Sequence, residues 1–453
     1  MSLIEASNAT PASQLALKER AKLTLDYHDL ENSINDLNHS IILLERIHQA
    51  VSKRHEVSVD STDRKAAQLA SSLHIAREHA ISLFNALVHS WNAGCHQNHE
   101  AKIYLDGTEI VKNQQNSKQT YFKKQKPHKF RLILSSKDTN LSEFWHEGTI
   151  EVLDDNSISH NLPMPAATLL GPNRPQVRIV TPAAISSAGT TSFIDVQNLC
   201  TTIGWATRER KILKFYLASQ QRIRCQYEDC AHLLIPKHYK SVSLEDLLMP
   251  LPQTGSPAKI GLKNRMMLAL NLASTLMELQ STPWLTNSWS KKAIKFLKTP
   301  VPQSSLSTAA ASTVLSVAID YQHPLISQHF QSGQQTSSNA PPLPPKEALL
   351  ELGIMLLELW HETTLETFYT STTMGQSGAP MSTDYWGRFM LASVWLDDPH
   401  DQPLPLYHTA ISQCVKCFFG GTFSTPSWND ANFRKALCKD LIEPLFESCK
   451  QWM

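Results

Sequence analysis

The sequence predicts a mainly α-helical fold with a minor β part, which is an α+β class. Three observations support this prediction. Apolar residues recur at helical spacing over 23–91, short segments have strand-like composition over 101–153, and residues 347–360 are apolar almost all the way round. The chain has 453 residues, of which 42% are hydrophobic and 18% charged. These values are ordinary for globular proteins, and the length allows two or three domains with a sizeable core.

The overall charge argues against two classes of partner. The net charge is +1, from 42 basic and 41 acidic residues, so the chain has no strong field to attract nucleic acid or an anionic membrane. We expect no nucleic-acid partner, and the composition does not support membrane contact. The sequence shows no signal peptide and no apolar run of membrane-spanning length, and its eight Cys are scattered. Reduced thiols are typical of the cytoplasm, where we expect this protein to be.

Residues 1–13 are small and polar and are expected to form a flexible tail. Residues 14–95 are predicted to form a helical hairpin or bundle, because two apolar seams are separated by the polar stretch 52–62. Steps of four and three residues mark the first seam: Leu23, Tyr27, Leu30, Ile34, Leu37, Ile41 and Leu44. The second seam has similar spacing: Ala66, Leu69, Leu73, Ala76, Ala80, Leu83 and Leu87. The alternative is self-association through the heptads of residues 23–51 as a coiled coil.

Residues 96–240 are predicted to form a small strand-containing lobe. Three segments have strand composition, 101–106, 130–134 and 149–153. A basic loop precedes the second strand and continues into it, and we interpret it as a solvated loop, with phosphate contact as the alternative. Its cations are Lys118, Lys123, Lys124, Lys126, Lys129 and Arg131. Residues 155–190 are rich in Pro, Ala, Ser and Thr and are expected to be a flexible insertion.

Residues 241–453 are predicted to form a helical domain with a linker over 299–345. A helix capped by Ser243 begins this domain, and strongly apolar helices follow at 262–279 and 347–360. Further helices are expected at 407–418 and 429–452. The helix at 347–360 has no side that could face water, so it is predicted to be the buried centre of the domain, with Gly353 and Leu356 as structural positions.

Two tryptophans, Trp284 and Trp289, follow the first of these apolar helices. We interpret them as packing anchors, and the alternative is a ligand cage.

Cysteine and histidine occur in three clusters, but none has the paired spacing of a structural zinc site. The candidate metal ligands are Cys95, His96 and His99. The other two clusters are expected to be core or surface residues: Cys225, Cys230 and His232, and the C-x-x-C of Cys414 and Cys417. G-x-S-x-G, H-E-x-x-H, P-loop and G-x-G-x-x-G motifs are absent from the sequence. We therefore expect no cofactor and no catalytic residues.

Several separated blocks resemble a family of uncharacterised fungal proteins. The blocks are SLEDLL, then R-x-x-L-A-L-x-L-A-S-x-L-x-E-L-Q-S-T-P-W-L, W-S-K-K-A-I-K-F-L and L-L-E-L-G-I-M-L-L-E-L-W, together with H-S-W-N-A-G-C-H upstream. In that family a helical N-terminal region, in some cases like the HeLo domains of fungal cell-death proteins, precedes the conserved blocks. The order of the blocks is also similar to the C-terminal lobe of a protein kinase.

The kinase resemblance implies that catalytic groups have been lost. Ser288 stands at the position of the catalytic-loop Asp, and Ala293 at that of the Mg²⁺-binding Asn. Asp320 is followed by Tyr321-Gln322 in place of F-G, and Ala348 replaces the Asp that opens the central kinase helix. The resemblance thus implies a degenerate kinase-like domain without phosphoryl transfer.

The function expected from the sequence is that of a non-catalytic interaction or signalling protein with a pseudokinase-like domain, in fungal self/non-self recognition or stress signalling. Its protein partner cannot be named from the sequence. One alternative is an atypical kinase in which Asp320 or Glu278 provides relocated metal ligands. Another is a membrane-active cell-death effector that acts through the N-terminal helices.

Overall fold

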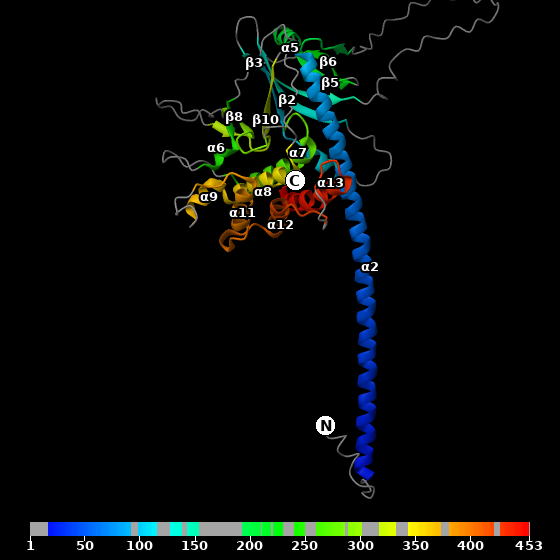
Figure 1. Ribbon diagram of the computed structural model, residues 1–453. Helices are drawn as coiled ribbons and strands as arrows, with labels where there is room; N and C mark the ends of the chain where they lie inside the picture. Colours follow the sequence, from blue (N-terminus) through cyan, green and yellow to red (C-terminus); the bar gives the residue numbers. More distant parts are fainter. Residues whose placement is uncertain are drawn as a thin grey trace, which may run out of the picture. The chain divides into compact units, whose positions relative to one another are not determined.

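The computed structural model describes fourteen segments of the chain. These are residues 17–91, 98–115, 127–137, 143–153, 193–209, 211–218, 221–229, 240–249, 260–285, 289–300, 317–331, 343–372, 380–420 and 426–452. The expected tail (1–13) and the expected insertion (155–190) lie outside them, as does part of the expected linker (299–345). The linker prediction is wrong for residues 317–331, which contain two strands of the sheet. The chain divides into two compact units, Met1–Arg64 and Lys65–Met453, called unit 1 and unit 2 below. The division falls within helix α2, Leu17–Ser90 (Figure 1).

The structure has one continuous helix, α2, where the sequence predicted a hairpin of two helices. The helix continues through residues 52–62, where the connection between two helices was expected. This stretch is polar, but it contains no Gly or Pro, and polarity alone does not end a helix. The second seam is buried within unit 2, where Leu73, Leu83 and Leu87 are at most 1% exposed. The core of unit 2, and not an antiparallel helix, is therefore the partner of this seam.

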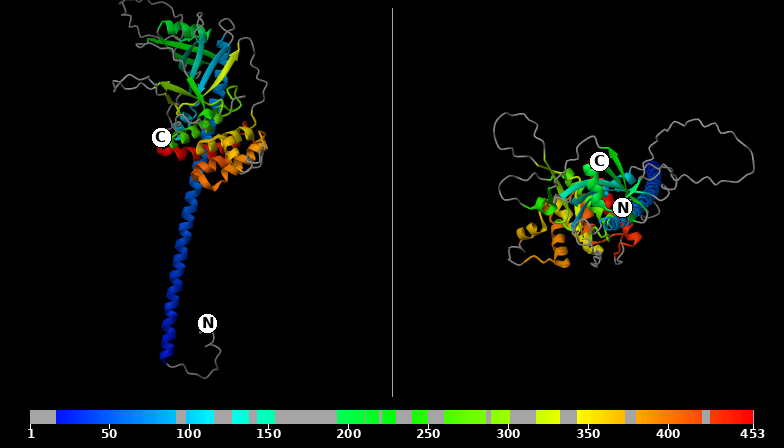
Figure 2. Two further views of the ribbon diagram at one scale, coloured as in Figure 1. Left: turned by 90° about the vertical axis from the view of Figure 1, so that its left-hand side faces the viewer. Right: turned by 90° about the horizontal axis from the view of Figure 1, so that it is seen from above.

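Unit 2 contains a mixed β-sheet (Figure 2). The sheet has ten described strands in the order β4-β6-β5-β3-β2-β1-β10-β8-β7, with β9 paired to β8. The strands are β1 (Asn98–Tyr104), β2 (Lys129–Lys137), β3 (Glu143–Val152), β4 (Ile194–Asp195), β5 (Lys211–Ala218), β6 (Arg222–Asp229), β7 (Lys240–Ser243), β8 (Lys295–Pro300), β9 (Val317–Ile319) and β10 (Leu325–Gln331). Strands β3 and β5 are parallel and are linked through helix α5 (Leu199–Arg208), while the other pairs are antiparallel. The α+β class and the three predicted strands are thus confirmed.

The sheet also changes the expected domain division. Strand β1 pairs with β10 over seven residues, so segments on both sides of residue 240 share one sheet. Residues 65–453 accordingly form one compact unit, with no boundary near 95 or 240. A pairing between strands so far apart in the chain has no local sequence pattern that could have revealed it.

The two faces of the sheet have different surroundings. Side chains alternate along β1, so Ala101 and Ile103 join the main core with the helices, while Lys102 and Tyr104 point to the other face. Tyr104 lies there in a small cluster with Ile133, Leu297 and Leu325. The helical side of the sheet is therefore the larger hydrophobic core.

The helices of unit 2 lie mostly in its C-terminal half (Figure 1). Besides α5 and the C-terminal part of α2, the described helices are α3 (Thr108–Gln115), α6 (Leu244–Leu248), α7 (Leu262–Leu279), α8 (Pro345–His361), α9 (Leu365–Ser371), α11 (Tyr385–Leu396), α12 (Pro405–Lys416), α13 (Ala431–Leu437) and α14 (Glu443–Cys449). Helix α7 has the predicted bounds, and Ser243 caps α6 in a capping box with Asp246. The helix expected over 429–452 is instead interrupted by a π-helical turn at Cys438–Ile442. Among the described helices, none is long and apolar enough to cross a membrane.

Helix α8 is enclosed on nearly all sides, as its composition indicated. Its residues from Ala348 to Leu359 are buried, and Leu356 is 0% exposed. Gly353 lies where α12 approaches closely, since a Cβ there would be 2.9 Å from Val415 Cγ2. The Tyr407 hydroxyl of α12 donates a hydrogen bond of 2.9 Å to the Leu356 carbonyl oxygen.

Candidate functional site

The loop between α7 and β8 is held by two tryptophans. Trp284 is 0% exposed and donates its indole N–H to the Ala80 carbonyl oxygen of α2 at 2.9 Å. Trp289 donates in the same way to the Ala348 carbonyl oxygen at the start of α8, at 3.1 Å. Both side chains thus hold the loop against buried helices, as expected for packing anchors.

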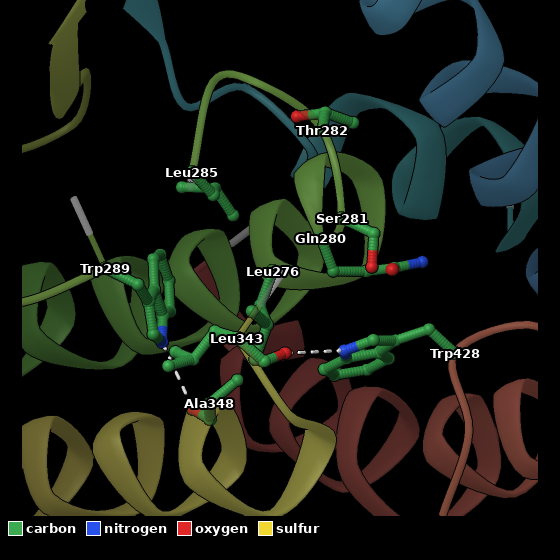
Figure 3. A pocket seen from close by; sticks show the side chains of 9 residues that line it. All are labelled: Leu276, Gln280, Ser281, Thr282, Leu285, Trp289, Leu343, Ala348 and Trp428. Atoms are coloured by element: carbon green, nitrogen blue, oxygen red, sulfur yellow. Dashed lines mark hydrogen bonds between the residues drawn. The ribbon is translucent and has the colours of Figure 1, made fainter. Parts of the chain in front are cut away.

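A small pocket lies beside Trp289, between the end of α7 and the start of α8 (Figure 3). Its lining comes from distant parts of unit 2: Leu276, Gln280, Ser281, Thr282, Leu285, Trp289, Leu343, Ala348 and Trp428. Its cavity volume of about 10 Å³ is far below the range of about 300–1,000 Å³ that is usual for ligand pockets. The pocket therefore has room for about one water molecule and not for a nucleotide.

One end of this pocket is polar. Gln280 and Ser281 extend toward the side of Trp428, whose indole N–H binds the Leu343 carbonyl oxygen at 3.2 Å (Figure 3). Gln280 is only 2% exposed, so its amide is enclosed by protein. Ser281 has a φ of 58°, in the left-handed region that side chains other than Gly rarely adopt. The chain thus turns sharply where α7 ends and presents these two polar side chains at the pocket.

A buried charge network lies next to Trp289. Lys291 Nζ is 2.6 Å from Glu358 Oε1 and 2.5 Å from Glu366 Oε2, and the Leu365 backbone N–H donates to Glu358 Oε1 at 2.8 Å. Glu358 is 0% exposed. Burial raises the pKa of Glu358 to about 7, although Lys291 opposes this shift. Burial lowers the pKa of Lys291, but attraction to Glu358 and hydrogen bonds to both carboxylates outweigh it and leave this pKa raised.

A carboxyl group with a pKa near 7 could act as a general acid or base if a substrate could reach it. Glu358 has no such access, because it is fully buried and its Oε1 is already bound to Lys291 and Leu365. The network therefore fixes the loop after Trp289 against α8 and α9.

The two acids considered as metal ligands from the kinase resemblance have other partners. The Asp320 carboxylate is 2.9 Å from His323 Nδ1 and accepts a hydrogen bond from the Gln322 backbone N–H. Glu278, the other acid considered for a metal, pairs with His128 Nε2 at 3.3 Å. Ser288 lies outside the described residues. Within the described part of the chain, no group of three or more His, Cys, Asp or Glu side chains is arranged to hold a metal ion.

The cysteine and histidine clusters do not come together as sites in the described segments. Cys95, His96, Cys230 and His232 lie outside those segments. His99 is 1% exposed, stacks on Trp91 with ring centroids 5.1 Å apart, and has its Nδ1 3.5 Å from Cys200 Sγ.

Among the other candidate cysteines, Cys225 and Cys414 are buried thiols and Cys417 is half-buried. Burial raises the pKa of Cys225 and places the pKa of Cys414 well above its ordinary value. A thiol that stays protonated is a poor nucleophile and a poor zinc ligand, so neither residue has the properties of a reactive cysteine.

Comparison with protein families assigns the chain. A family model described as Domain of unknown function (DUF7580) matches residues 70–452. The chain belongs to this family. The match begins inside α2, shortly after the start of unit 2, and covers nearly all of that unit. Searches of curated proteins and of solved structures gave no match, so the fungal origin and the kinase-like lobe of this DUF7580 chain stay predictions.

Two acids, Glu351 and Glu358, lie inside the apolar helix α8, and their partners could not be predicted from the sequence. Glu351 pairs with Arg388 of α11 at 2.5 Å, and Glu358 pairs with Lys291. A charge within an apolar helix has to be paired or neutralised when it is buried. The two acids therefore indicated that cations approach α8, but the sequence could not show which cations these are.

Proposed function

We propose that this DUF7580 chain is a non-catalytic interaction or signalling protein that associates with a second copy of itself through the first seam of α2. The observation that supports this proposal is the exposure of that seam within unit 1. Its side chains are open to solvent: Ile34 at 50%, Leu37 at 61%, Ile41 at 45% and Leu44 at 65%. The second seam of the same helix is buried in unit 2, so the two seams differ in whether they have a partner.

The residue types of the exposed seam favour a second copy as the occupant. Ile34 and Ile41 occupy one heptad position, and Leu30, Leu37 and Leu44 the other. This arrangement of β-branched residues at one position and Leu at the other favours parallel two-stranded coiled coils. Ile42 at 47% and Leu43 at 58% exposure widen the apolar surface. Continuous apolar surface of this kind is typical of an interaction site.

The arrangement of charges in unit 2 supports a non-catalytic role. Kinase catalysis depends on acids that hold Mg²⁺ and orient the substrate hydroxyl. Here Asp320 is engaged by His323, and Ala293 replaces the Asn. The pocket beside Trp289 is also smaller than a nucleotide site needs. Incubation of the purified chain with labelled ATP, Mg²⁺ or Mn²⁺ and a generic substrate tests this part. Turnover that Asp320→Ala abolishes would contradict it.

Sedimentation of the full chain tests the association. We expect a dimer in the micromolar range, and the double variant Leu37→Asn/Ile41→Asn is expected to sediment as a monomer with an unchanged thermal melt of unit 2. Ile75→Asn is the matched control, because Ile75 is also an exposed Ile of α2, at 45%, but lies in unit 2. A wild-type monomer at all these concentrations would refute self-association.

The same variants separate pairing from membrane contact. If the wild-type chain stays monomeric, binds anionic lipid vesicles and loses this binding in Leu37→Asn/Ile41→Asn, the seam serves a lipid surface. A dimer that does not bind vesicles supports pairing between two copies.

A further inference from the structure

Two arginines from distant parts of the chain lie close together in unit 2. Arg77 belongs to α2 and is hydrogen-bonded to Gln280, and Arg434 belongs to α13 and donates to the Trp428 carbonyl oxygen. Gln280 and Trp428 line the same small pocket. Burial, followed by repulsion from Arg77, lowers the pKa of Arg434. The pKa of His74, one turn before Arg77, is lowered first by burial and then by both arginines. Three basic side chains therefore face the same region.

Arg77 is buried without full hydrogen bonding. It is 7% exposed, its Nη1 is 3.4 Å from Gln280 Oε1, and its Nη2 is 3.2 Å from Glu78 Oε1. Its Nε–H has no hydrogen-bond partner among the described residues. The Glu78 side chain is 55% exposed, so water screens its charge and this ion pair compensates little for the burial of Arg77.

Arg434 and Gln280 also keep free donors. Arg434 Nη1 donates to the Trp428 carbonyl oxygen at 2.8 Å, and its Nε–H has no acceptor in the segments that are described. Gln280 is 2% exposed and uses Oε1 for Arg77, so its Nε2 group faces away and is likewise without a described partner. The amide orientation is fixed by chemistry, because a guanidinium can only donate and must meet the oxygen.

Few acids compensate these charges. Glu78 lies beside Arg77, and Asp430 lies near Arg434, where its carboxylate caps α13 by accepting from the Asn432 N–H at 2.9 Å. Buried arginines are normally paired with carboxylates or phosphates. Both acids are exposed to water, which screens their charge, and the buried N–H donors of Arg77, Arg434 and Gln280 stay unused among the described residues. An anion that only accepts hydrogen bonds would complement these donors.

We infer that Arg77, Arg434 and the Gln280 amide form a binding site for a phosphate-type dianion, either free phosphate or a phosphate monoester. A dianion matches two guanidinium groups better than a single carboxylate does, because it carries about two negative charges and three acceptor oxygens. The guanidinium fork binds such oxygens in pairs. Gln280 connects this site to the small pocket, and the exposed Ser281 stands next to it at the turn (Figure 3). This site is independent of the pairing proposed for unit 1.

The full-length chain tests the site by its thermal melt in increasing inorganic phosphate or phosphoserine at constant ionic strength, with acetate as the anion control. We expect a saturable rise in the melting midpoint with a phosphate species and none with acetate. A response to both species indicates free phosphate chemistry, and a response to phosphoserine alone indicates a monoester.

The variants identify the residues. Arg434→Gln is expected to weaken binding at least tenfold, whereas Arg208→Gln, at an exposed arginine of α5, leaves it unchanged. Gln280→Glu places a carboxylate against Arg77, so it is expected to raise the midpoint without phosphate and to abolish the phosphate response. Absence of a saturable response in the wild type, or an unchanged response in both Arg434→Gln and Gln280→Glu, would overturn the inference.

Discussion

Replacement of Lys291 by Met is expected to destabilise unit 2, because it leaves Glu358 buried without its cation. The Lys291 side chain is 9% exposed and that of Glu358 is 0% exposed, so water cannot take the place of the lost partner. Removal of one partner from such a buried pair typically costs about 3–5 kcal/mol. This is a large part of the usual free energy of unfolding of about 5–15 kcal/mol.

The loss should depend on pH in a definite direction. In the native chain burial raises the pKa of Glu358 to about 7 from an ordinary 4.5, so the folded state holds an extra proton between these values. The free energy of unfolding contributed by this group therefore falls as pH rises through that window. Lys291→Met removes an attraction that opposes the shift, so the pKa rises further and the fall extends to higher pH. Each further pH unit is worth about 1.4 kcal/mol.

Urea denaturation followed by circular dichroism, near pH 5.5 and near pH 8.5, measures this effect. Lys291→Met is expected to lose little at the lower pH, where Glu358 is protonated in both proteins, and several times more at the higher pH. Glu358→Gln is the control, since Lys291 keeps Glu366 and the amide oxygen can still accept from Leu365. The double variant should recover most of the loss at high pH. An equal loss at both pH values would refute a charged Glu358.

Two further substitutions test the packing of α8. Gly353→Ala should cost about 1–3 kcal/mol by overpacking, because the new Cβ would lie 2.9 Å from Val415 Cγ2 and 3.2 Å from the Val415 backbone N. A urea midpoint equal to that of wild type would show that α12 can move away from the new Cβ without a cost in stability. Leu356→Asp should make the chain insoluble, because a charge at a fully buried position costs several kcal/mol. A soluble variant with a cooperative wild-type melt would contradict the enclosure of α8.

The elements that could be predicted from the sequence are those that are specified by residues close together in the chain. Helices α7 and α8 have long apolar periodic patterns, and Pro344 and Pro345 set the start of α8. The continuity of α2 was missed because polar residues were taken for a turn, although without Gly or Pro nothing ends the helix there.

The sites were harder to predict, since their members are far apart in the chain. Lys291 meets Glu358 across 67 positions, and Arg77 meets Gln280 across 203. Such pairs form only when the core folds and brings the two side chains together. A single sequence shows each member as an ordinary charge, and only the burial of its neighbours indicates that a partner must exist.

The pairing of β1 with β10 bears on how the chain folds during synthesis. Strand β1 can form a meander with β2 and β3 early, but the partner of its other edge, Leu325–Gln331, leaves the ribosome more than 200 residues later. At about 5–20 residues per second this delay is on the order of 10–40 s. The buried seam of α2 also waits, because Phe84 and Trp91 pack on Trp284 and Phe330. Nascent chains of this protein should therefore expose an open strand edge and an apolar helix face for much of translation, which makes them clients for ribosome-associated chaperones.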